Sequence, residues 1–266
     1  MVIAAAVFCG AAMAQAGNPG LYLFQIPSTR GAAVGVPLSD MAQVDLHVSN
    51  PAHLAERLAN TSVSIVAIED KLVRITAGRH ETLTGDPLPT HREATFVVDF
   101  EDAPVAALVE ALRTEFGATP SLDELIQFVH AAIAHKTYRR SFDLASQVAS
   151  SREGDCTEHA VLLAAMARAT GRPARVVLGI MLMESPDRLS SFGHAWTEIH
   201  DDESWRIADA TRPELQLPDA RPRYLPLMPL GDEGLGYALH LLDLTTVYPA
   251  RIDWIQVAER SVTLAP

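Results

Sequence analysis

The sequence predicts a chain of mixed strands and helices, with a β-rich front section, a helical middle and a hairpin after it. Three observations support this. Runs rich in β-branched residues lie before residue 102, capped apolar segments follow up to residue 171, and two alternating segments flank an acidic turn near residue 201. A period of two is typical of strands and a period of 3.6 is typical of helices.

Composition limits the classes of protein that this chain can represent. The 266 residues, of which 48% are apolar and 20% charged, are enough for one large domain or two modest ones with a real core. Lys and Arg total 21 against 33 Asp and Glu, a net charge of −12. Such an acidic surface repels phosphates, which argues against nucleic-acid partners. Since no run approaches the roughly 20 apolar residues that span a bilayer, no membrane span is predicted.

The amino terminus resembles a secretory signal. Residues 1–14 are uncharged and mostly apolar, and small residues at 12, 14 and 16 fit a cleavage site. We therefore predict a signal peptide over residues 1–16 and a periplasmic or secreted protein; the alternative is a buried amino-terminal helix. Cleavage would remove Cys9 and leave Cys156 as the only cysteine. Exported thiols normally pair, so a solitary one calls for a chemical explanation.

The front section, residues 17–102, is predicted to be a small β-rich unit. Alternation and β-branched content predict strands, and the segment 52–59 is predicted to be a short helix. The predicted strands are 44–48, 61–68, 71–77 and 94–100.

The middle section, residues 103–212, is predicted to start with helices. One covers 103–116 and stops at Gly117, and a second follows Ser121, whose pairing with Glu124 makes a capping box. A third follows Asp155 and ends at Gly171, because Asp155 and Glu158 form another capping box.

The last section, residues 213–266, is predicted to be a Pro-rich extension that packs on the core. Its prolines predict turns, most of them between 213 and 229, and an apolar patch follows at 237–247. A final strand is predicted at about 252–257.

Cys156 lies in the first turn of the third helix. Unpaired N–H groups and the positive end of the helix dipole there favour an anion, so we expect a lowered thiol pKa and a nucleophilic thiolate. The same N–H groups could bind the oxyanion formed on attack at an acyl carbon. The alternative is a small buried residue in an apolar helix.

The hairpin 194–209 supplies a candidate base and its partner. With Asp201 and Asp202 at the turn, His194 lies directly opposite Asp209, close enough for a carboxylate to bind an imidazole. The period of two also brings Trp196 and Trp205 to that face. We predict that His194 exchanges the thiol proton and that Asp209 orients the imidazole. The alternative for this pair is a surface ion pair.

These motifs resemble the bacterial transglutaminase-like core. The matching segments, between about residues 120 and 212, are Gly154-Asp155-Cys156-Thr157-Glu158-His159-Ala160, Ala164-x-x-Arg168-x-x-Gly171-Arg172-Pro173-Ala174-Arg175, Gly193-His194-Ala195-Trp196-x-Glu198 and Trp205-x-x-x-Asp209. The resemblance implies an α+β fold of papain-like arrangement, with the Cys156 helix packed on an antiparallel sheet. It also implies that Cys156 is the nucleophile, His194 the acid/base and Asp209 its orienting partner.

Other candidates have simpler explanations. Trp196 is a candidate wall of the substrate groove, with core filling as the alternative, and His159 is expected to be a packing residue rather than a second base. Cys156, His194, His200 and Asp209 are all metal-ligand types, but no known ligand spacing occurs. We therefore predict neither a metal nor another cofactor.

The predicted function is acyl transfer through a Cys156 thioester. The substrate is an amide or peptide bond in a peptide or protein, with cell-envelope material among the candidates, and the resemblance favours hydrolysis by a protease or amidase over protein crosslinking. The rival hypothesis is a non-catalytic binding or assembly module that retains the fold. A binding role does not need a thiol, an imidazole and a carboxylate in register.

Overall fold

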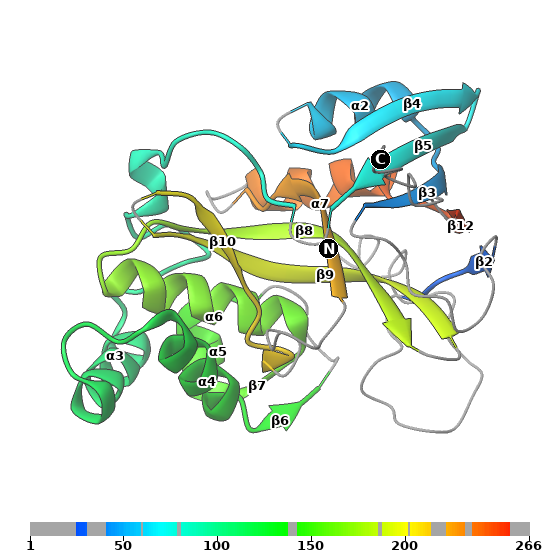
Figure 1. The fold of residues 1–266 in the computed structure, drawn as a ribbon. Coiled ribbons are helices and arrows are strands. Elements are labelled where there is room, and N and C mark those ends of the chain that lie inside the picture. Colours follow the sequence, from blue (N-terminus) through cyan, green and yellow to red (C-terminus); the bar gives the residue numbers. More distant parts are fainter. Residues whose placement is uncertain are drawn as a thin grey trace, which may run out of the picture.

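The described part of the protein has an α+β fold built on two five-stranded sheets. The computed structural model describes residues 25–30, 41–59, 61–78, 81–137, 143–185, 188–201, 203–213, 222–231 and 236–255. Figure 1 shows helices gathered on one side of the first sheet and the second sheet on its other side. The predicted signal peptide, residues 1–16, lies outside the described residues.

The first sheet, which we call the core sheet, is antiparallel throughout. Its strands run in the order β1-β9-β8-β11, and β10 also pairs with β9. Their bounds are β1 (Gln25–Ile26), β8 (Ala174–Ser185), β9 (Arg188–His200), β10 (Trp205–Ala208) and β11 (Pro222–Pro229). The short strands β1 and β10 pair with different parts of β9: β1 opposite residues 191–192 and β10 opposite residues 197–200.

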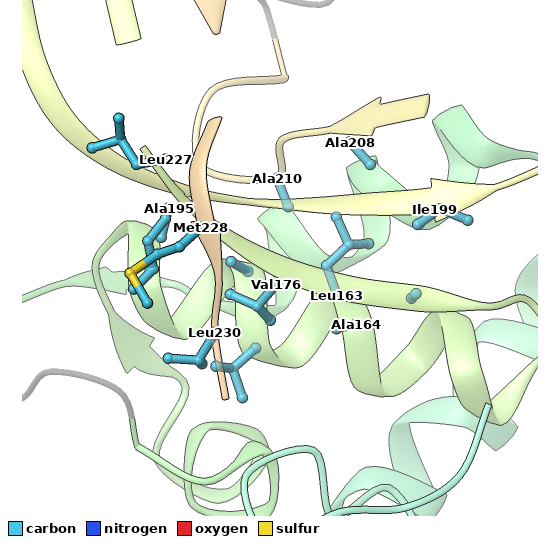
Figure 2. Close-up of a cluster of buried hydrophobic side chains, with 14 of the residues drawn as sticks. Leu163, Ala164, Val176, Ala195, Ile199, Ala208, Ala210, Leu227, Met228 and Leu230 are labelled. Carbon is cyan, nitrogen blue, oxygen red and sulfur yellow. The ribbon is translucent and has the colours of Figure 1, made fainter. Parts of the chain in front are cut away.

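The helices that cover the core sheet lie together in sequence, as predicted. They are α3 (Ala103–Phe116), α4 (Leu122–Ala132), α5 (Ala145–Ser151) and α6 (Cys156–Ala169). Helix α6 is buried along almost its whole length, between the sheet and the other three helices. Its many alanines allow this close approach: Figure 2 shows Leu163 and Ala164 near Val176 and Ile199 of the sheet. A hydrogen bond of 2.9 Å from the Thr197 hydroxyl to the Ala160 carbonyl also joins the two layers.

The second sheet is made from both ends of the chain. Its order is β2-β12-β3-β5-β4, with bounds β2 (Ser28–Arg30), β3 (Ala42–His47), β4 (Ser64–Glu69), β5 (Leu72–Ala77) and β12 (Arg251–Ile255). Helices α2 (Pro51–Leu58) and α7 (Gly236–Val247) accompany it. Because β1 and β11 belong to the core sheet, the front section and the tail each contribute a strand or more to both sheets.

Three smaller elements complete the described chain. They are the 3₁₀ turn Pro89–His91 and the parallel pair β6 (His135–Lys136) and β7 (Glu153–Gly154). No helix among the described residues is long and apolar enough to cross a bilayer.

Most of the predicted elements are confirmed, and the segment 94–100 is not. Its β-branched run forms turns instead of a strand, although Val97 and Val98 are fully buried. The backbone of this segment forms hydrogen bonds within itself and with the start of α5. Thr95 N–H bonds the Val98 carbonyl, and the Val97 carbonyl accepts from Ala145 N–H at 2.9 Å. Burial of these side chains therefore comes from a loop packed on a helix end.

The prolines of the tail were predicted to make turns, and this is wrong for β11. Pro222, Pro226 and Pro229 all lie within this strand. The strand is at the end of the core sheet and pairs only with β8 in the described sheet, so its other edge needs no N–H donors. The register shifts between Pro226 and Met228, which accommodates one of the prolines.

A buried ion pair ties the segment before α3 to the core sheet. Arg175 of β8 and Glu198 of β9 meet at 2.7 Å, and both are nearly fully buried. Arg175 also donates to the Leu83 carbonyl, and Leu83 N–H lies 3.3 Å from the Glu198 carboxylate. The Arg175 guanidinium stacks 3.7 Å above the ring of Trp205. This pair therefore fixes Leu83, two strands and the hairpin together.

Candidate active site

The start of α6 has the predicted capping box. The Asp155 side chain accepts from Thr157 N–H at 2.8 Å, and the Glu158 carboxylate accepts from Asp155 N–H at 2.9 Å. Glu158 is fully buried beneath Gly154, where a Cβ would lie 2.3 Å from the Glu158 Cβ. This cap places Cys156 in the first turn, as the sequence predicted.

The thiol of Cys156 has a raised pKa, against our prediction of a lowered one. Burial raises the pKa most, and the charge of Asp155 raises it further. Glu158 and Asp209 act in the same direction, while the N–H of Ala195 lowers the pKa. The carboxylates that cap the helix thus oppose the helix dipole. A thiolate at neutral pH therefore needs a partner that accepts its proton.

His194 and Asp209 form the predicted pair. Nε2 of His194 lies 2.8 Å from Oδ2 of Asp209, and both side chains are buried. Burial alone would raise the pKa of Asp209, but attraction to His194, with hydrogen bonds from His194, Tyr224 and Thr211, lowers it to about 2. An ionised Asp209 accepts a hydrogen bond from the Nε2–H of His194, so Nδ1 is the ring nitrogen that can exchange a proton with the thiol.

The hairpin register differs from the predicted one by two residues. Trp205 pairs with His200 and Ala208 pairs with Thr197, so each residue of β9 faces a residue two positions later than predicted. Asp202, one of the two predicted turn residues, lies outside the described residues. Two bonds close the turn at this new position: Asp201 N–H bonds the Ser204 carbonyl at 3.1 Å, and Ser204 N–H bonds the Asp201 side chain at 3.0 Å. His194 is therefore not directly opposite Asp209, which follows the end of β10. A shift of two residues preserves the face on which each side chain lies, and the diagonal neighbours still meet.

The structure brings Cys156 to the same point. Its sulfur accepts a hydrogen bond from the N–H of Ala195, the residue after His194 in β9. The charge of Asp209 is close enough to raise the pKa of the thiol. Cys156 is a free thiol: the residue as a whole is partly exposed, whereas its thiol group is buried. The three residues predicted as catalytic thus come from a helix start, a central strand and the end of a hairpin, and they lie in one site.

Comparison with known families agrees with this arrangement. Residues 107–210 match the model of the transglutaminase-like superfamily. This part of the chain is a transglutaminase-like core. The match includes α4, α5, α6 and the strands β8–β10 and ends one residue after Asp209, whereas β11 and α7 lie outside it. None of the curated proteins matches the chain.

Solved structures with a similar arrangement are distant in sequence. A candidate cysteine protease from Cytophaga hutchinsonii is 15% identical, with a TM-score of 0.42 over 72% of this chain and 77% of that one. The periplasmic domain of TgpA from Pseudomonas aeruginosa, bound to ethylmercury, is 18% identical, with a TM-score of 0.42 over 71% of this chain and 84% of that one.

Sequence reasoning missed Tyr224, which lies outside the matched core. Its hydroxyl donates to Oδ2 of Asp209 at 2.9 Å, the same oxygen that meets His194. Tyr224 comes from β11, and its ring packs 5.2 Å from that of Trp196. No local signal marks it, because its role depends on β11 joining the sheet beside β8.

Trp196 and His159 are both buried in the transglutaminase-like core. Trp196, 1% exposed, packs in a cluster with Val177, Met181 and Tyr224, which favours the core alternative over a groove wall. His159 is 0% exposed, and burial lowers its pKa to about 3. Its Nδ1 bonds the Asp155 carbonyl at 2.5 Å, and its Nε2 lies 2.7 Å from Nζ of Lys136. This environment fits the predicted packing role.

The metal-ligand types of the rival hypothesis do not gather. Among the described residues, no group of three or more His, Cys, Asp or Glu side chains could bind a metal ion. His200 lies at the far end of β9 from His194 and packs edge-on against Trp205 at 5.2 Å.

Proposed function

We propose that the protein is a thiol enzyme that cleaves amide or peptide bonds through a thioester at Cys156. The match to a superfamily of cysteine enzymes supports a thiol-dependent enzyme. The observation that carries the finer proposal is the buried His194–Asp209 pair beside a helix-start thiol. The alternative was a solvent-exposed ion pair, whereas these two side chains are buried and lie 2.8 Å apart.

The proposed first half-reaction forms the thioester. Nδ1 of His194 accepts the thiol proton, and the sulfur of Cys156 attacks the amide carbon. The carbonyl oxygen becomes an oxyanion, which the backbone N–H groups at the start of α6 can stabilise. When this intermediate collapses, the C–N bond breaks and the imidazolium gives its proton to the departing amine.

The proposed second half-reaction releases the acyl group. His194 accepts a proton from water, the resulting hydroxide attacks the thioester carbon, and the C–S bond breaks. The acid leaves, and the sulfur regains its proton from His194. Asp209 stabilises the imidazolium in both halves, and its lowered pKa keeps it ionised throughout.

The experiment that tests this proposal compares wild type with Cys156→Ala. Both purified proteins are incubated with peptide mixtures and with cell-wall fragments, and the products are identified by mass spectrometry. We expect new cleavage products from wild type alone. Identical product patterns from two proteins with equal melting temperatures would overturn the enzyme and favour a binding module.

Hydrolysis is proposed over crosslinking, and the acceptor can be tested directly. With a substrate peptide found in that screen, the reaction is repeated with and without a primary amine such as glycine ethyl ester. Hydrolysis gives a free acid in both reactions. A product that carries the amine in most of its molecules would instead assign protein crosslinking or transamidation.

Export is part of the same proposal. The amino-terminal residues 1–16 motivate it, because they combine an uncharged apolar run with small residues at a cleavage site. Protein recovered from its native host should start near Gln15 or Gly17 and come from the periplasm or medium. Full-length protein in the cytosol would contradict export.

A further inference from the structure

The edge of β9 next to His194 is left open between two short strands. In the registers of the described residues, residues 193–196 pair with neither β1 nor β10. His200 N–H bonds the Pro173 carbonyl on the β8 side at 2.9 Å. Since N–H groups alternate along a strand, Gly193 and Ala195 direct theirs to the opposite, open edge.

Two side chains bind these N–H groups. Ala195 N–H donates to the sulfur of Cys156, and Gly193 N–H donates to the hydroxyl of Tyr248. Two residues of a strand span about 6.6 Å, so the phenol oxygen and the sulfur lie side by side along one strand edge. The charge of Cys156 also helps to raise the pKa of the Tyr248 hydroxyl, as expected for two neighbouring groups.

Gly193 makes this approach possible. A Cβ at residue 193 would lie 2.4 Å from the Tyr248 oxygen and 2.9 Å from its ring. A Cβ essentially never lies that close to another heavy atom, so any other residue here would displace Tyr248. The glycine of the Gly193-His194 motif thus has a physical reason: it admits a side chain from the tail of the protein.

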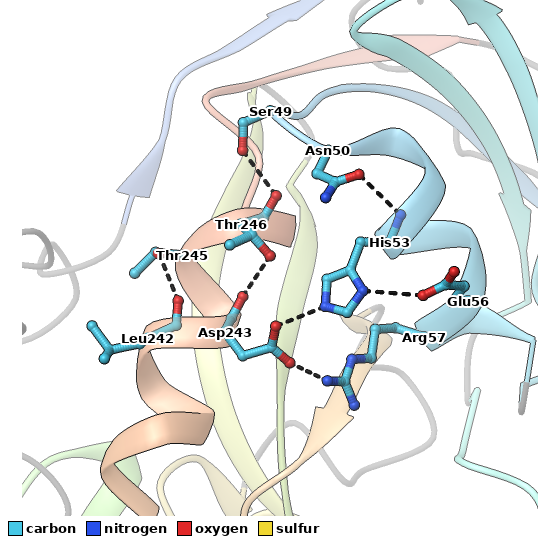
Figure 3. Close-up of polar contacts among 9 residues, drawn as sticks. All are labelled: Ser49, Asn50, His53, Glu56, Arg57, Leu242, Asp243, Thr245 and Thr246. Carbon is cyan, nitrogen blue, oxygen red and sulfur yellow. Dashed lines mark hydrogen bonds and ion pairs between the residues drawn. The ribbon is translucent and has the colours of Figure 1, made fainter.

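The position of Tyr248 is set by segments outside the transglutaminase-like core. Its N–H bonds the Leu244 carbonyl at 2.9 Å and so continues α7. Figure 3 shows α7 attached to α2 through Asp243, which meets His53 at 2.7 Å and also pairs with Arg57. The Ser49 hydroxyl donates to the Thr246 carbonyl at 2.9 Å.

We propose that Tyr248 is a further catalytic residue, whose hydroxyl donates a hydrogen bond to the acyl oxygen of a group bound at Cys156. Its proton stays on the phenol, and no bond of the tyrosine is made or broken. The inference rests on the proposed function, because it assigns a second donor for the oxyanion besides the N–H groups of α6. Burial raises the pKa of Tyr248, so the hydroxyl remains a donor at neutral pH.

The test uses two probes of Cys156 that differ in one respect. Iodoacetamide alkylates the sulfur without forming an oxyanion. The peptide aldehyde acetyl-Ala-alaninal adds the sulfur to its carbon, so its oxygen becomes tetrahedral, as in the proposed intermediate. Aldehyde affinity is measured as protection of the thiol against iodoacetamide, and it needs no knowledge of the natural substrate.

We expect Tyr248→Phe to weaken aldehyde binding roughly 10- to 100-fold, the usual effect of one hydrogen bond to a charged group. Its alkylation rate should equal that of wild type. Thr245→Val is the matched control, since it removes an exposed α7 hydroxyl that bonds only within the helix, to the Leu242 carbonyl. This variant should leave both measurements unchanged.

Unchanged aldehyde affinity in a folded Tyr248→Phe protein would overturn the role of Tyr248, and so would a tighter complex. Failure of the proposed function looks different: the wild-type thiol would react with neither probe at neutral pH. Melting temperatures report folding. As a second variant, Gly193→Ala should push the hydroxyl aside and weaken the aldehyde similarly, with no further loss when combined with Tyr248→Phe.

Discussion

Among single residues, His194 controls whether Cys156 can be a thiolate. Burial and the carboxylate of Asp155 raise the pKa of the thiol, and the imidazole is the nearby group suited to accept its proton. In His194→Ala the thiol should stay protonated at neutral pH. We expect iodoacetamide labelling at pH 7 to fall about 10²–10⁴-fold, the range typical of a general base, and to recover only at alkaline pH.

The control for that experiment is His159→Ala. His159 lies one turn from Cys156 on the same helix, but it is buried against Lys136 and Asp155. Its loss should affect folding more than the labelling rate of the folded protein. Equal damage from both variants without unfolding would mean that the wrong histidine is assigned. Asp209→Asn should lose less than His194→Ala, and the double variant should be little worse than His194→Ala alone.

Asp209 should make the free energy of unfolding depend on pH in the acidic range. Its pKa is about 2 in the folded protein, against about 3.9 in an unfolded chain. A depressed pKa stabilises the fold at pH above the unfolded value, and the contribution disappears as pH falls through the folded value. We expect about 2 kcal/mol to be lost between about pH 4 and pH 2. Urea unfolding of wild type and Asp209→Asn should converge over that range; a constant difference would contradict this.

At the scale of elements, local signals predicted helices well. The capping boxes at Ser121 and Asp155 fix where α4 and α6 begin, because each depends only on residues three apart. The hairpin turn lacked such a signal, so the predicted pairing register was wrong by two residues. A shift of two residues leaves every side chain on the predicted face of the hairpin, so His194 still contacts Asp209.

Other elements depended on partners distant in sequence. The run 94–100 has strand composition, yet its backbone bonds to turns and to the start of α5. The prolines of β11 are tolerated because the strand lies at a sheet edge. Tyr224 and Tyr248 reach the site only after β11 and α7 have joined the core, so the sequence could predict the three core residues and not these two.

The ion pair between β8 and β9 gives an element-scale prediction. Arg175→Met should leave Glu198 buried without its partner and destabilise the fold by about 3–5 kcal/mol. In the double variant Arg175→Met/Glu198→Leu no buried charge remains, so most of that stability should return. Urea unfolding of the three proteins measures this. A double variant as unstable as the single one would show that Leu83 and Trp205, rather than the charge, need Arg175.

For the whole molecule, the two ends of the chain form one support for the site. The tail contributes β11 and β12 to different sheets, and the front section contributes β1 to the core sheet and β2, β3, β4 and β5 to the second. Helix α7 joins these parts, since its Asp243 bonds to α2 and the residue after its end, Tyr248, contacts Gly193. Contacts far from Cys156 should therefore affect chemistry there.

Asp243→Ala tests that coupling. It removes the shared partner of His53 and Arg57, so α7 should loosen at a cost of about 1 kcal/mol, as expected for partly exposed pairs. We expect weaker aldehyde binding and an unchanged rate of iodoacetamide labelling, because only the position of Tyr248 changes. Glu56→Ala is the matched control: Glu56 meets the same histidine at 3.3 Å, but its side chain is 77% exposed. If both variants bind the aldehyde as wild type does, the attachment of α7 to α2 does not position Tyr248, and the helix is placed by its packing on β11 instead.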